Sequence, residues 1–137
     1  MSPSVLLVDD ESDIITSTFS ALRRAGFTVH SFTDPIEAIN HIREEGCKDC
    51  RLLLSDIRMP KMNGFQLVRT LKELRPEMKV IMMTAFEVDK KEFEIVFPSL
   101  PVDTIVKKPF RPSIVAEMIK EIYYSSEGKK IRKQNLI

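Results

Sequence analysis

The chain has 137 residues, of which 43% are hydrophobic and 30% charged, with a formal net charge of +1 at neutral pH. This size and composition predict one compact domain with its own core, and they exclude an intrinsically disordered chain. The near-zero charge gives no overall basic field that would attract nucleic acid, and no apolar stretch approaches the ~18 residues of a membrane span.

Short, unbroken apolar runs alternate with helical patterns in the first half of the chain. The run Val5–Val8 precedes a helical repeat of apolar residues that stops near Gly26, and a second run covers Thr28–Phe32. Asp34 and Pro35 then open a helix, because aspartate caps a helix and proline suits its first turn. Unbroken apolar runs are typical of strands that helices cover on both faces.

The second half of the chain repeats the same alternation. Strands are expected at 52–55, 80–83 and 104–107, with helices after Gly64, around 93–100 and from Pro112. Regular strand–helix alternation predicts right-handed crossovers and a doubly wound parallel sheet, which is an α/β fold. The folded domain should span 1–124, and the polar, basic stretch 125–137 should be a flexible tail.

Polar side chains stand at the ends of four of these runs: Asp9 and Asp10, Asp56, Thr84, and Lys108. Because the carboxyl ends of parallel strands share one edge of the sheet, we expect these side chains in one cleft. Clustered carboxylates repel one another, so one pKa should rise unless a cation neutralises the group. Mg²⁺ suits such a site because it prefers oxygen ligands, and a carboxylate can also attack phosphorus to form an aspartyl-phosphate.

Together these motifs resemble the receiver domain of two-component response regulators, over roughly residues 4–124. The matching segments are Leu7-Val8-Asp9-Asp10-Glu11, Ser55-Asp56-Ile57-Arg58-Met59-Pro60, Met62-Asn63-Gly64, Met83-Thr84-Ala85 and Lys107-Lys108-Pro109-Phe110. The resemblance, which is to the stand-alone, chemotaxis-receiver type, implies a flavodoxin-like sheet of five parallel strands in the order 2-1-3-4-5, with five helices.

The resemblance also implies roles for the acidic residues. Asp56 would accept a phosphoryl group from a phosphohistidine on a sensor histidine kinase or a phosphotransfer protein. Asp10 would bind Mg²⁺ directly and Asp9 largely through water, beside Asp56 and the backbone carbonyl of Arg58.

By the same resemblance, Thr84 and Lys108 would bind the phosphoryl oxygens, and the peptide bond before Pro109 would be cis. One position departs from the family pattern, because Ile105 stands where receivers commonly carry Tyr or Phe. Isoleucine is stiff at its first torsion and has no hydroxyl. We therefore expect an altered output surface, with Ile105 as a candidate part of it.

The function implied by the resemblance is a phosphorylation-controlled signalling module in the cytoplasm, whose phosphorylated state alters binding to a downstream protein. Such a module assists its own phosphorylation and dephosphorylation but has no separate substrate. Nucleic acid is not expected to bind this chain alone, and a homodimer stays open. A pseudo-receiver that works without phosphorylation remains an alternative: the presence of all five site residues argues against it, whereas Ile105 keeps it open. An aspartate-nucleophile phosphatase is a weaker one, because such enzymes carry a second acid where this chain has Arg58.

A C-x-x-C pair, Cys47 and Cys50, precedes the third apolar run, with His41 upstream and His30 in the second run. One such pair is weak evidence for zinc, which normally takes four ligands. Two cysteines and an N-terminus without the basic and apolar segments of a signal peptide indicate a reducing, cytoplasmic setting. We therefore expect two reduced thiols at the surface.

Overall fold

The computed structural model describes residues 3–44, 47–85 and 102–124. In these ranges, five parallel strands form one sheet in the order β2-β1-β3-β4-β5. The strands are β1 (Ser4–Val8), β2 (Thr28–Phe32), β3 (Cys50–Asp56), β4 (Lys79–Thr84) and β5 (Thr104–Lys107). The predicted α/β class and strand order are confirmed.

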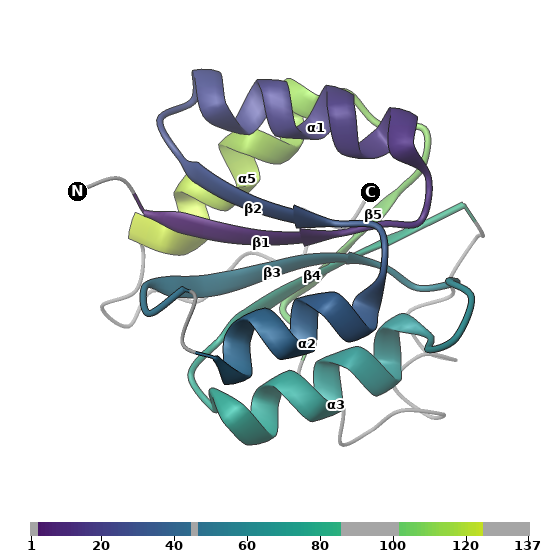
Figure 1. Cartoon of the computed structure of the whole chain (residues 1–137). Coiled ribbons are helices and arrows are strands. Elements are labelled where there is room, and N and C mark those ends of the chain that lie inside the picture. Colours follow the sequence, from purple (N-terminus) through teal and green to yellow (C-terminus); the bar gives the residue numbers. More distant parts are fainter. Residues whose placement is uncertain (1–2, 45–46, 86–101, 125–137) are drawn as a thin grey trace.

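Within the described ranges, four helices cover the two faces of the sheet (Figure 1). They are α1 (Ser12–Arg24), α2 (Pro35–Arg43), α3 (Gly64–Leu74) and α5 (Pro112–Tyr124). Helices α1 and α5 pack on one face, and α2 and α3 on the other. The helix expected around 93–100 and the tail expected at 125–137 lie outside the described residues. None of the described helices is long and apolar enough to cross a membrane.

Two apolar cores, one on each face of the sheet, explain why the strand sequences are unbroken apolar runs. Along β1, Leu6 and Val8 pack into the core beneath α2 and α3, whereas Val5 and Leu7 pack into the core beneath α1 and α5. All four side chains are fully buried. A strand covered on both faces needs apolar residues at every position rather than at every second one.

The expectation of reduced surface thiols is wrong. Cys47 and Cys50 are joined in a disulfide, and both are buried, with 2% and 1% of their surface exposed. The cysteines do not lie at the surface because β3 begins at Cys50, earlier than expected, and both side chains pack into the apolar core beneath α2 and α3.

Side-chain hydrogen bonds cap the N-termini of α2 and α3. The Asp34 carboxylate accepts a hydrogen bond of 2.9 Å from the backbone N–H of Ile36, which caps α2 as expected. At α3, Asn63 and Gln66 form a reciprocal capping box, with distances of 2.9 and 3.0 Å between their side chains and backbone N–H groups. These bonds satisfy N–H groups that the helix itself leaves unpaired.

Glycine is required at position 64 because α3 starts against the end of β3. The backbone N–H of Gly64 donates to the carbonyl of Ile57 at 2.7 Å. A Cβ at this position would overlap the carbonyl oxygen of Asp56 and crowd the Met82 side chain. The absence of a side chain thus lets α3 hold the turn that follows Asp56.

Gly64→Ala should destabilise the fold by about 1–3 kcal/mol, the usual cost of forcing extra atoms into a packed site. Gly26→Ala is a useful control, because its φ of 99° strains any side chain but the space around it is open. Urea denaturation should show lower stability for both variants. Only Gly64→Ala should also shift the amide resonances of Asp56 and Ile57, and unchanged resonances would contradict the close approach of α3.

Candidate metal and phosphoryl site

The carboxyl ends of four strands bring polar side chains to one edge of the sheet. The strand register pairs the residue before Asp9 with the residue before Asp56, and it pairs Thr84 with the residue before Lys108. All four of these site residues are buried. Their convergence therefore follows from the alignment of parallel strands.

The ammonium group of Lys108 lies among three carboxylates. Its Nζ is 2.7 Å from Asp9 Oδ2, 3.2 Å from Glu11 Oε1 and 3.5 Å from Asp56 Oδ2. The backbone N–H of Lys108 donates to the carbonyl of Thr84 at 2.6 Å. The peptide bond between Lys108 and Pro109 is cis, which is the conformation that the resemblance implies.

In each of the two buried aspartates, one carboxylate oxygen accepts a hydrogen bond from a backbone N–H group. Asp9 Oδ1 accepts a hydrogen bond of 2.9 Å from the N–H of Glu11, and Asp56 Oδ1 accepts one of 2.9 Å from the N–H of Ile57. Their second oxygens face Lys108. Asp9 Oδ2 is buried and has no aligned hydrogen bond, in spite of its closeness to the ammonium group. This oxygen retains the capacity to accept a further positive ligand.

The donor set fits a small divalent cation. Among the described residues, carboxylate oxygens of Asp9, Glu11 and Asp56 all lie within 4.8 Å of one another. Mg²⁺ prefers such oxygen ligands and completes its coordination with water and phosphate. The buried Asp9 oxygen without an aligned donor is the specific feature that a cation would satisfy.

Two predicted metal-site residues are placed differently from the buried aspartates. Asp10 is exposed and does not belong to the group of oxygens within 4.8 Å, whose third member is Glu11. Glu11 belongs to the matching sequence motif, but the resemblance implies no role for it. The only sequence signal for it is a third acidic residue after the strand. Arg58 is exposed as well, and metal binding by its carbonyl stays a prediction.

Ile105 does not lie on the surface. It is 8% exposed, pairs with Met82 in the sheet and packs into the core beneath α2 and α3. Its role in an output surface stays a prediction.

Burial and charge together perturb the ionisation of the site. Burial raises the pKa of Asp56 to about 6, and the negative charges of Asp9 and Asp10 add to this effect, while Lys108 opposes it. Burial also raises the pKa of Asp9 in spite of its contact with Lys108. Burial disfavours the charge on Lys108, but its close contact with Asp9 and its ion pair with Asp56 raise its pKa overall. The carboxylates therefore carry more negative charge than one lysine neutralises.

Comparison with known proteins agrees with this geometry. The family described as the response regulator receiver domain matches residues 5–120. The crystal structure of a CheY-like response regulator receiver domain protein from Methanospirillum hungatei JF-1 superposes with a TM-score of 0.81 at 31% identity. The superposed region covers 93% of this chain and 98% of the chain from Methanospirillum hungatei.

Two curated proteins from Brucella abortus (strain 2308) are also similar. The response regulator receiver protein CpdR is 35% identical over 82 residues, which are 60% of this chain and 66% of CpdR. The sensor kinase CckA is 32% identical over 124 residues, which are 88% of this chain and 12% of CckA. The chain thus spans less than two thirds of the length of either curated relative.

Asp56→Asn should stabilise the metal-free protein at about pH 7–8 by about 1–3 kcal/mol. The raised pKa means that the folded state holds the Asp56 proton more tightly than the unfolded state does, so ionisation above pH ~6 costs stability. The advantage of the variant should therefore shrink as the pH falls toward ~4. Urea denaturation with chelator at several pH values tests this, with Asp13→Asn, an exposed change on α1, as the control for losing one charge. A pH-independent advantage of Asp56→Asn would contradict it.

Proposed function

The chain belongs to the response regulator receiver domain family, and we propose that it is a phosphorylation-controlled signalling module with Asp56 as its phosphoacceptor. The observation that carries the proposal is the position of Lys108, whose ammonium lies within ion-pair distance of both Asp9 and Asp56 at the carboxyl edge of the sheet. This arrangement puts a nucleophilic carboxylate next to a fixed positive charge that phosphoryl oxygens can use.

Asp56, Lys108 and Thr84 each have a role in the proposed reaction. A carboxylate oxygen of Asp56 attacks the phosphorus of a phosphohistidine, the P–N bond breaks, and the imidazole leaves. The Asp56 oxygen held by the Ile57 N–H stays in place, while the other faces the incoming group. Lys108 attracts the phosphoryl oxygens as a compact charge, and the Thr84 hydroxyl donates a hydrogen bond to them.

Mg²⁺ is the cofactor that we propose for this reaction. Asp9 and Asp56 would hold it, together with the carbonyl of Arg58 and with Asp10, which the family resemblance favours over Glu11. When bound, the metal ion supplies positive charge that offsets the negative charge on the phosphoryl oxygens. The excess of carboxylates over ammonium groups in the site supports this assignment.

A sensor histidine kinase or a phosphotransfer protein is the proposed source of the phosphoryl group. A sensor kinase is itself among the proteins that contain a similar segment, which supports this class of partner. Phosphorylation would then change the affinity for a downstream protein, because a new dianionic group draws in Thr84 and Lys108.

A pseudo-receiver is the second candidate function. The observation in its favour is Ile105, which is buried and has no aromatic ring to move when Thr84 shifts. The two functions differ in whether Asp56 accepts a phosphoryl group at all.

Incubation with Mg²⁺ and acetyl phosphate should add one phosphoryl group to the wild-type chain, as measured by intact mass. Asp56→Asn should gain none while remaining folded, because the amide has nearly the same shape but is not a nucleophile. Asp13→Asn, an exposed change on α1, should be labelled like the wild type. A labelled Asp56→Asn chain would show that another residue is the acceptor, and an unlabelled wild type would favour the pseudo-receiver.

Asp10→Asn should lower Mg²⁺ affinity by roughly 10–100-fold and slow phosphorylation with it, because one negative charge near the metal is lost. Glu11→Gln should have a smaller effect on both. Metal affinity is measured by titration calorimetry and phosphorylation by the rate of mass gain. Equal phosphorylation rates with Mg²⁺ and with excess chelator would rule out a role for the metal ion.

A further inference from the structure

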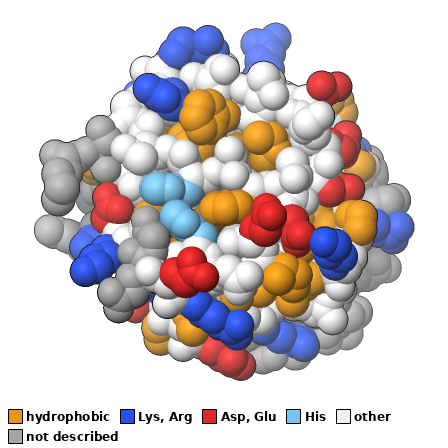
Figure 2. Space-filling model, in the orientation of Figure 1, with side chains coloured by type: hydrophobic (Ala, Val, Ile, Leu, Met, Phe, Trp, Pro, Cys, Tyr) orange, Lys and Arg blue, Asp and Glu red, His pale blue; other side chains and the backbone are white. Residues whose placement is uncertain are grey.

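Both histidines of the chain lie beside its two cysteines, away from the aspartate site. A ring nitrogen of His30 and the sulfur atoms of Cys47 and Cys50 all lie within 4.8 Å of one another. The ring of His41 packs on that of His30, with 4.8 Å between the ring centroids. In Figure 2 the two histidines form one pale blue patch at the surface, whereas both cysteines are buried.

Three elements of the fold bring these residues together. His30 is paired with Leu6 in the sheet, and Leu6 faces the core beneath α2 and α3. His41 comes from the last turn of α2, which covers that same face. Cys50 is the first residue of β3 and packs with Cys47 into the same core. The cluster therefore joins β2, α2 and the start of β3.

His41 has an unused ligand atom. Its Nε2 is buried and has no hydrogen-bond partner. Burial lowers the pKa of His41, and the nearby charges of His30 and Arg75 add to this effect, while Glu44 opposes it. His41 therefore favours the neutral imidazole, which is the form that binds metal ions.

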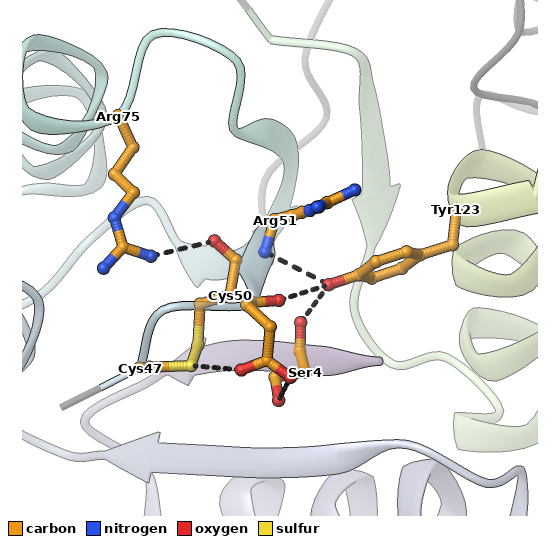
Figure 3. Close-up of a disulfide and its surroundings, with 7 residues drawn as sticks. Ser4, Cys47, Cys50, Arg51, Arg75 and Tyr123 are labelled. Carbon is orange, nitrogen blue, oxygen red and sulfur yellow. Dashed lines mark hydrogen bonds between the residues drawn. A yellow bond between two sulfur atoms is a disulfide. The ribbon is translucent and has the colours of Figure 1, made fainter. Parts of the chain in front are cut away.

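Hydrogen bonds anchor the backbone around the cysteines, as Figure 3 shows. Arg75 donates a hydrogen bond of 3.4 Å to the carbonyl of Cys50, and the Tyr123 hydroxyl accepts one of 3.1 Å from the N–H of Arg51. The same hydroxyl donates to the carbonyl of Ser4. These contacts hold the start of β3 in place.

We propose that the reduced chain binds one Zn²⁺ ion through the thiolates of Cys47 and Cys50 and the imidazoles of His30 and His41. Zinc takes two sulfur and two nitrogen ligands in a tetrahedron, at ~2.3 Å and ~2.0–2.1 Å, so its ligand atoms lie about 3.3–3.8 Å apart. Three of the four ligand atoms are already within 4.8 Å of one another. The fourth ligand would come from His41, whose ring centroid lies 4.8 Å from that of His30 and whose Nε2 has no hydrogen-bond partner.

The disulfide and the zinc site are alternative states of the same two sulfur atoms. A dithiol reductant passes two electrons and two protons to the Cys47–Cys50 bond, which opens to two thiols while the dithiol becomes a disulfide. Binding of Zn²⁺ then releases the two thiol protons. The disulfide links two residues that are 3 positions apart in the sequence. The zinc ion would also link these two cysteines to β2 and α2.

The test uses the full chain, reduced with dithiothreitol under nitrogen, desalted, and titrated with Co²⁺ as a spectroscopic substitute for Zn²⁺. One equivalent should produce the intense d–d bands of tetrahedral cobalt and a thiolate-to-cobalt charge-transfer band, and Zn²⁺ should remove both. The oxidised chain should give neither. Zn²⁺ should also raise the Tm of the reduced chain only. A reduced chain that binds no cobalt, or gives only the weak bands of an octahedral ion, would overturn the proposal.

Variants of the histidines test the ligand set without touching the buried cysteines. His30→Asn and His41→Asn should each lower Zn²⁺ affinity by more than the roughly 10–100-fold that loss of an outer partner costs, and should change the cobalt d–d bands. Asn40→Ala, an exposed change next to His41 on α2, is the matched control and should bind like the wild type. Wild-type affinity and spectrum in either histidine variant would overturn the four-ligand site.

Discussion

One buried ammonium group holds together the carboxyl edge of the sheet. Lys108 follows β5, yet its Nζ lies 2.7 Å from Asp9 after β1 and 3.5 Å from Asp56 at the end of β3. Charges interact more strongly in such a site than in water, because little solvent screens them. Burial raises the pKa of Asp56, and the negative charge of Asp9 adds to this effect because one lysine among several carboxylates does not neutralise them all. The same excess of carboxylate oxygens is the kind of donor set that a divalent cation prefers.

The fold holds these charged side chains at strand ends whose positions are fixed by packing. Two apolar cores bury the strands from both faces, so the strand ends are fixed relative to one another. The capping box of Asn63 and the missing side chain of Gly64 set the start of α3 against the end of β3. The turn after Asp56 therefore presents its carboxylate in one orientation. A site arranged in advance in this way does not have to reorganise when charge develops in a reaction.

The fold and the buried site residues could be predicted from the sequence, because apolar runs define the strands and parallel strands align their ends. The contact of Glu11 with Lys108 could not, since it depends on how the turn after β1 folds back to let the Glu11 N–H reach Asp9. The state of Cys47 and Cys50 could not either, because free thiols, a disulfide and a metal site share the C-x-x-C spacing. Their burial depends on how α2 and α3 cover the start of β3.

One lysine does not neutralise the buried carboxylates of the site, and the ionisation of Asp56 reports the resulting balance of burial and charge. The measurement is an NMR titration of the Asp56 carboxyl carbon, assigned with Asp56→Asn, in chelator and again in excess Mg²⁺. We expect a pKa of about 6 for Asp56 without metal, and a clear decrease when Mg²⁺ is bound. A pKa near the ordinary value of 3.8 that does not respond to Mg²⁺ would contradict it.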